Sequence, residues 1–172
     1  MSQASKHIDW CLKKAQEEIE ECKHLGKKFK HRGLFKVEAS LEEAKKHIIK
    51  AEHNLVVTEY LVKGGFTDAS IGTIFYTMYR CFLAIAAKFG YSSGNQTCTI
   101  ALIEYLKEEN KIDLDLKFIK YLQYQDENKE SVIEMREDST YGTELEVDKS
   151  RIDFLIRESK ELIEATKQII YR

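Results

Sequence analysis

The chain contains no proline in its 172 residues, and this absence constrains its fold more than any other single feature. Proline interrupts helices most effectively, so a chain without it must end its helices on Gly, Asn, Asp or Ser. Apolar residues recur at a spacing near 3.6 through most of the sequence, and no run of alternating β-branched residues occurs. We therefore predict an all-α protein, an antiparallel bundle of about five to six helices in one compact domain.

The periodic segments are separated by short polar breaks that set the expected helix boundaries. We expect helices over 6–25, 40–63, 67–89, from 97 or 99 to 109, 113–135, and from 148 or 150 to 170. Ser40 and Glu43 form a capping-box pattern at the start of the second helix, and Gly64-Gly65 ends it. The polar stretch Gln123–Lys129 is where the fifth helix is expected to bend or break, and Lys27–Lys36 is expected to be a loop.

Composition excludes several classes of protein. No run approaches the roughly 18 apolar residues of a membrane span, and the N-terminus lacks the apolar core of a signal peptide, so we expect a cytoplasmic protein. Cys11, Cys22, Cys81 and Cys98 show no short metal-ligand spacing, so we expect reduced thiols, no metal site and no cofactor. His47 lies four residues after Glu43, and we interpret this pair as a solvated helix face rather than metal ligands.

The candidate functional features are a basic stretch, a single arginine in an apolar helix and a polar segment. Between Lys23 and Lys36 there are six Lys or Arg residues, two His and no acid. Basic residues neutralise phosphates and aromatic rings stack on unpaired bases, so this stretch is a candidate RNA contact through Lys27, Lys28, Lys30 and Arg32. The alternative is a solvated loop whose Phe29 and Phe35 pack into the core.

Arg80 is the one charge in the middle of the most apolar helix. A charge there is costly unless it is paired or beside water. Arg80 therefore either pairs with an acid such as Glu130 or Glu134, or lines a cleft. The segment 136–141, with Arg136, Asp138 and Tyr141, is a second dense polar cluster, and its alternative reading is an ordinary helix terminus before Gly142.

At this point the sequence resembles the HEPN superfamily, the helical proteins named for higher eukaryotes and prokaryotes nucleotide-binding. The residues that carry the resemblance are Ala51, Leu55 and Leu61, the break 64–66, Asp68-Ala69, the aromatic-rich stretch 74–84 and the helix end 88–90. The resemblance covers roughly 44–169. We accordingly divide the chain into an N-terminal helix and basic loop extension (1–39) and a HEPN-like bundle (40–172).

The resemblance implies a helical bundle that is often a homodimer, and many members are metal-independent ribonucleases. Some are toxins paired with a nucleotidyltransferase-like antitoxin. Their site is an Arg followed by four to six residues and a His, and the matching place here is Arg136, with Tyr141 where the His would stand. A Tyr with an ordinary pKa near 10 is a poor general base at neutral pH.

The sequence therefore predicts a homodimeric accessory protein associated with RNA or nucleotide, catalytically weak or inactive. Arg80, Arg136 and Tyr141 are expected to line one cleft that the basic stretch extends. One alternative is a working metal-independent ribonuclease toxin, in which Arg136 stabilises charge on the phosphate and Tyr141 or Asp138 orients the ribose hydroxyl. Another is a helical protein–protein interaction module with no ligand.

Overall fold

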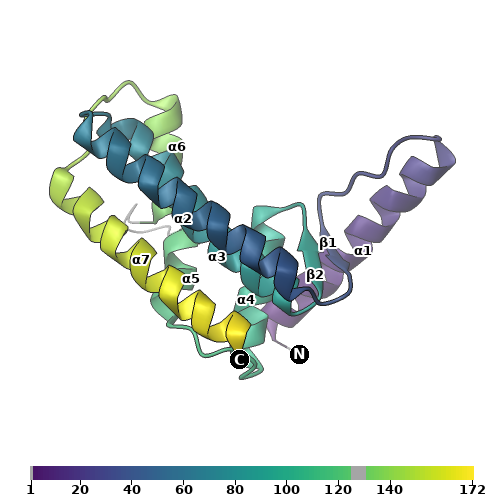
Figure 1. Ribbon diagram of the computed structural model, residues 1–172. Coiled ribbons are helices and arrows are strands. Elements are labelled where there is room, and N and C mark those ends of the chain that lie inside the picture. Colours follow the sequence, from purple (N-terminus) through teal and green to yellow (C-terminus); the bar gives the residue numbers. More distant parts are fainter. Residues whose placement is uncertain (1, 125–130) are drawn as a thin grey trace.

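A computed structural model describes residues 2–124 and 131–172, and these residues form a predominantly helical structure (Figure 1). Seven helices and two three-residue strands make up the described part of the chain. In chain order they are α1 (Gln3–His24), β1 (Leu34–Lys36), α2 (Leu41–Lys63), α3 (Thr67–Lys88), β2 (Tyr91–Ser93), α4 (Gln96–Glu108), α5 (Leu116–Leu122), α6 (Val132–Tyr141) and α7 (Lys149–Tyr171). The all-α prediction is confirmed.

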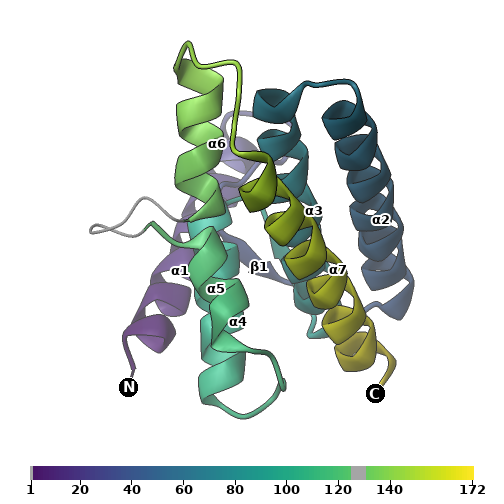
Figure 2. The same ribbon diagram turned by 90° about the vertical axis from the view of Figure 1, so that its left-hand side faces the viewer.

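Helices α2 and α3 form the long helical hairpin around which the other helices are arranged. The Ser40 hydroxyl accepts a hydrogen bond from the Glu43 backbone N–H at 3.1 Å, so α2 begins where the capping pattern predicted. Gly64 and Gly65 form the turn between the two helices, and Gly65 has a φ of +83°, a conformation that glycine adopts at little cost. Figure 2 shows α7 lying beside both helices of this hairpin.

Helix α3 is the central helix of the protein. Its buried side chains include Ile71, Phe75, Met78 and Phe82, and they contact residues of most other helices in one continuous core. By length and composition alone α3 could cross a membrane, but 61% of its most apolar window is buried inside the protein. That degree of burial is typical of the core helix of a soluble protein.

In place of the predicted fifth helix the structure has two shorter helices, α5 and α6. Most of the polar stretch Gln123–Lys129, where a bend or break was expected, lies outside the described residues. Helix α5 ends at Leu122, and α6 begins after Ser131, whose hydroxyl caps it by accepting from the Glu134 backbone N–H at 3.3 Å. Lys117 on α5 forms an ion pair with Glu158 on α7 at 3.0 Å, which ties the two helices together across the bundle.

The N-terminal helix is half docked and half projecting. Its first half buries Ala4, Ile8, Cys11 and Ala15 against α4 and β1, and Ile8 and Leu34 belong to the same core as α3. From Gln16 onward no described residue of α1 is fully buried. Figure 1 shows this half of α1 and the following loop extending away from the bundle as an arm.

The extension contains two features that the sequence did not predict. Cys11 on α1 and Cys98 on α4 form a disulfide, so the expectation of four reduced thiols was wrong. The two cysteines are 87 residues apart in the sequence, and only the docking of α1 on α4 brings them together.

The second feature is a small antiparallel sheet, in which Leu34 pairs with Ser93 and Lys36 with Tyr91. The loop that was expected over 27–36 therefore ends at residue 33, just before β1 begins. The strand was not predicted because three residues are too few to show an alternating pattern. The sheet is reached through Gly33, where a Cβ atom would lie 2.3 Å from the Cys11 carbonyl oxygen, so only glycine allows this approach.

Candidate functional site

Arg80 leaves the central helix α3 toward α2 and meets a histidine. Its Nη1 atom lies 3.2 Å from Nδ1 of His47, and both side chains are partly buried. A guanidinium can only donate hydrogen bonds, so Nδ1 of the neutral imidazole is the acceptor and Nε2 carries the ring proton. Of the two alternatives for Arg80, the structure favours the one in which this side chain lines a cleft.

The cleft around this pair encloses about 750 Å³ of empty space, part of it open to solvent. It is lined by the segment that leads into α2, by one face of each of α2 and α3, and by β2. The lining residues are Val37, Glu38, Ser40, Glu43, His47, Arg80, Leu83, Ala87, Tyr91, Ser92 and Ser93. Because α2 begins at Ser40, the positive end of its helix dipole lies at this cleft.

The environment of His47 keeps its imidazole neutral at neutral pH. Burial lowers the pKa of His47 below its usual value of 6.5, and the nearby charge of Arg80 lowers it further. Glu43 opposes both effects, because its Oε1 atom lies 4.0 Å from Nε2 of His47. The cleft therefore presents one permanent cation and one imidazole that can gain a proton when an anion arrives.

The small sheet connects the basic stretch to this cleft, but none of the stretch's basic side chains is among the lining residues. The stretch enters β1 at Leu34, β1 pairs with β2, and all three residues of β2 line the cleft. Lys27, Lys30 and Arg32 line a different hollow, which lies between this stretch and the projecting half of α1. Glu18 and Glu21 share that hollow, and the Arg32 backbone N–H donates a hydrogen bond to Glu18.

Neither phenylalanine of the basic stretch is in the core. Phe29 is 63% exposed and Phe35 is 40% exposed, so the alternative in which both rings pack inward is wrong. Lys23 lies over the Phe29 ring, 5.7 Å from its centroid. The arm thus carries exposed rings among basic side chains.

Arg136 belongs to α6 and packs against a different part of the central helix α3. Its guanidinium lies over the Phe75 ring, 4.4 Å from the centroid, and its Nη2 atom is 3.6 Å from Glu137. Among the described residues, no part of α6 lines the cleft at Arg80. Arg136 therefore contacts α3 through an aromatic ring, on a part of that helix away from Arg80.

The other two residues of the polar cluster are exposed. Tyr141 is 85% exposed at the end of α6, and Asp138 is also on the surface. Of the two acids considered as partners for Arg80, Glu134 accepts a hydrogen bond from Ser131 at 2.6 Å, and Glu130 lies outside the described residues. The structure joins Arg80 to His47 rather than to the segment 136–141.

His47 is the site residue that sequence reasoning missed. Its spacing from Glu43 was visible, but the contact that gives it chemical meaning comes from a residue 33 positions later. Two features of the sequence could have pointed to this pair. One is the single Arg within the apolar helix α3, and the other is the partly apolar face of α2, the helix before it. Comparison with known proteins adds nothing to this, because no family model and no curated protein matches the sequence.

Proposed function

We propose that the protein is a HEPN-like accessory protein that binds the phosphate groups of RNA or a nucleotide in the cleft of Arg80 and His47. The observation that carries this proposal is the contact between the guanidinium and the neutral imidazole inside a cleft. A phosphate that bonds to the guanidinium draws it away from Nδ1, which then takes up a proton. Both groups become cationic donors to the same anion.

The surroundings of the pair support an anionic ligand. The N-terminus of α2 adds positive partial charge, and the hydroxyls of Ser40 and Ser93 line the same cleft. Two acids, Glu38 and Glu43, line the cleft, and Lys46 offsets the charge of Glu43 at 3.3 Å. The basic stretch supplies further cations and the exposed Phe29 ring to a longer, single-stranded ligand.

The test measures binding of a fluorescent single-stranded RNA and of ATP by the wild type, Arg80→Gln and His47→Gln. Loss of a charged hydrogen bond costs about 1.5–3 kcal/mol, so each variant should bind at least roughly tenfold more weakly. Lys63→Gln is the matched control, since it removes one positive charge at the far end of α2. Unchanged affinity in both cleft variants, with melting temperatures like that of the wild type, would sink the proposal.

A ribonuclease toxin with a nucleotidyltransferase-like antitoxin is the second candidate, and one observation favours it. The chain lacks a His near Arg136, but Arg80 and His47 place the same two chemical groups side by side. Once the phosphate engages Arg80, Nδ1 is free to accept the proton of a ribose 2′-hydroxyl. Cleavage of total RNA in EDTA that His47→Gln abolishes while leaving binding measurable would favour this candidate.

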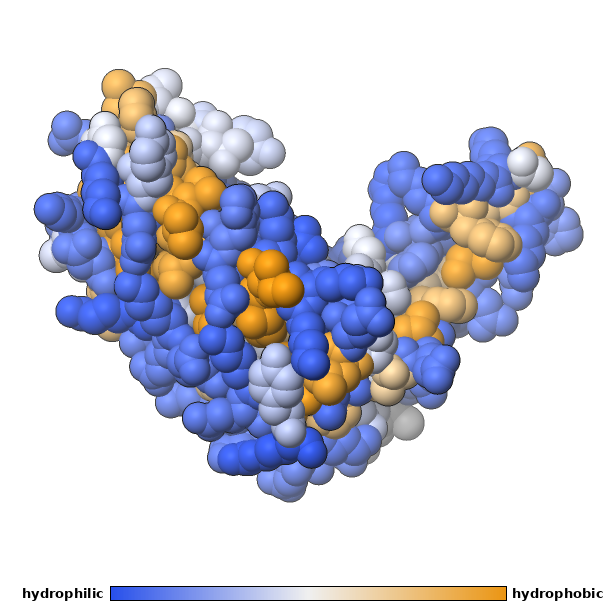
Figure 3. Space-filling view, in the orientation of Figure 1, coloured by the Kyte–Doolittle hydropathy of each residue, from blue (hydrophilic) through white to orange (hydrophobic). Residues whose placement is uncertain are grey.

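An exposed apolar face of α2 is the proposed homodimer surface. Ile49 and Val56 are each 65% exposed and Tyr60 is 76% exposed, and their spacing places them on one face of the helix. Figure 3 shows apolar side chains gathered over this helix. Exposed apolar patches mark interaction surfaces in soluble proteins, and a second copy of the chain would cover this one. The same face would serve a protein–protein interaction module without ligand, which the RNA-binding test distinguishes.

A further inference from the structure

We propose that His7, Cys11 and Cys98 form a Zn²⁺ site when the disulfide between the two cysteines is reduced. One ligand atom from each of the three side chains lies within 4.8 Å of the other two. The three residues come from two helices, and the sequence separates the cysteines by 87 residues. This site is distinct from the phosphate-binding cleft and does not depend on it.

Local structure explains why the three side chains converge. His7 and Cys11 are four residues apart on α1, so they lie one above the other on the same face. Cys98 lies in the first turn of α4, where its backbone N–H donates to the Asn95 side chain at 3.0 Å. A helix N-terminus carries positive partial charge, which stabilises a thiolate. The docking of α1 on α4 completes the set.

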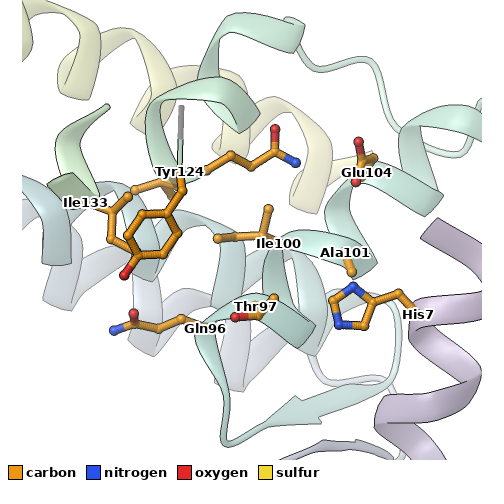
Figure 4. Close-up of a pocket in the computed structure, with 10 residues that line it drawn as sticks. His7, Gln96, Thr97, Ile100, Ala101, Glu104, Tyr124 and Ile133 are labelled. Carbon is orange, nitrogen blue, oxygen red and sulfur yellow. The ribbon is translucent and has the colours of Figure 1, made fainter. Parts of the chain in front are cut away.

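The donor set fits zinc better than other common cations. Two sulfurs and one imidazole nitrogen are ligands that Zn²⁺ prefers, whereas Mg²⁺ and Ca²⁺ require oxygen. Three protein ligands leave the fourth tetrahedral position open to water or another ligand. A pocket with His7 in its lining lies beside α4, and Figure 4 shows the imidazole at one end of it, next to Ala101. Glu104 and Gln96 also line this pocket.

The disulfide and the metal site exclude each other. A dithiol reductant breaks the Cys11–Cys98 bond by giving it two electrons, and is itself oxidised to a disulfide. The two cysteines then carry thiol protons, and both protons are released when their sulfurs bind the metal. Either state ties α1 to α4, one by a covalent bond and the other through the ion.

The experiment uses the full chain, reduced with a phosphine and freed of metal. Zn²⁺ is titrated in competition with a coloured chelator, and Co²⁺ is added separately to report metal–sulfur bonds by their charge-transfer absorption. We expect one ion per chain, a thiolate-to-cobalt band, and loss of both after oxidation of the thiols. Trp10, the single tryptophan, stands beside His7 with ring centroids 5.9 Å apart, so its fluorescence should change as the metal binds.

Three variants separate this site from general thiol binding. His7→Gln keeps both cysteines and should still form the disulfide. It should bind Zn²⁺ at least about tenfold more weakly, because even the loss of a residue that only orients a metal ligand weakens metal binding by that factor. Cys98→Ser should lose the cobalt band. Cys22→Ser, which removes an unpaired cysteine from the same helix, should bind like the wild type. No Zn²⁺ binding by the reduced wild type, or equal affinity in all three folded variants, would overturn the proposal.

Discussion

The Nη1 atom of Arg80 lies 3.2 Å from Nδ1 of His47, and this contact joins the central helix α3 to the helix before it. It explains how a charge is tolerated on the most apolar helix of the protein. Arg80 reaches a cleft partly open to solvent, so its guanidinium keeps some hydration, and the imidazole satisfies one of its donors. Burial lowers the pKa of His47, and the charge of Arg80 lowers it further, so the imidazole is neutral at neutral pH.

Acid should destabilise the protein partly through His47. The folded-state pKa of His47 lies below its usual value of 6.5, because of burial and then Arg80. Between the folded-state pKa and 6.5, His47 therefore binds more protons in the unfolded chain than in the folded protein. The stability that the neutral His47 contributes is complete above about pH 6.5 and is lost as the pH falls through the folded-state pKa. Urea unfolding across this range should show a smaller acid loss for His47→Gln than for the wild type.

A matched control for this pH effect is His53→Gln, which removes an exposed imidazole from the same helix. It should lose stability on acidification as the wild type does. A proton NMR titration of Arg80→Gln should place the pKa of His47 closer to its usual value than in the wild type. Identical pH profiles for the wild type and His47→Gln would contradict this assignment.

The basic stretch should contribute to RNA binding mainly through phosphate contacts. Replacing Lys27, Lys28, Lys30 and Arg32 by Glu should weaken binding and flatten the dependence of log affinity on log salt. Each lost contact to a single strand reduces the slope by roughly 0.7. The measurement is RNA affinity over a range of salt concentrations, with Phe29→Leu as a variant that removes stacking but no charge. If the fourfold variant keeps the wild-type slope, the stretch does not contact phosphate.

How much of this structure was readable from the sequence depends on how local each feature is. The capping of α2 at Ser40 and its end at Gly64-Gly65 follow from neighbouring residues, and both were predicted. The disulfide between Cys11 and Cys98 and the contact of Arg80 with His47 depend on how helices dock, which no local pattern encodes. The sequence analysis singled out Arg80 from its place in an apolar helix, but it grouped this residue with Arg136 and Tyr141 and missed His47, the side chain that it contacts.

Arg136 should matter first for packing. Its guanidinium stacks on Phe75, a fully buried ring, and such a cation–π contact contributes about 0.5–2 kcal/mol. Arg136→Ala should lower the melting temperature, and Arg136→Lys should restore part of the loss, because a lysine can still lie over the ring. Binding of RNA should change little in either variant. If Arg136→Ala abolishes RNA cleavage without any loss of stability, Arg136 belongs to a catalytic site.

The four cysteines should differ in their access to an alkylating reagent. In the native, unreduced protein only Cys22 should react, because Cys11 and Cys98 are bonded to each other. Cys81 is fully buried, and burial raises its pKa to about 12, so almost no reactive thiolate exists near pH 8. Mass spectrometry should count one modified cysteine in the native protein, two after unfolding and four after unfolding with reduction. Four without reductant would show that the disulfide is absent.

We expect the proposed homodimer to depend on the exposed apolar face of α2. Ile49, Val56 and Tyr60 lie on this face, and covering them with a second chain removes apolar surface from water at about 25 cal/mol for each Å². Light scattering should give a mass of about 40 kDa, twice the 20.1 kDa of one chain.

Val56→Lys adds a charge that the interface must desolvate, so it should shift the protein to monomers. It should not unfold the protein, because the side chain is exposed in the single chain. Leu145→Lys, at a similarly exposed position outside the helices, is the control and should leave the dimer intact. A wild type that scatters as a 20.1 kDa particle at micromolar concentration would contradict the dimer, and a Val56→Lys dimer as stable as the wild type would place the interface elsewhere.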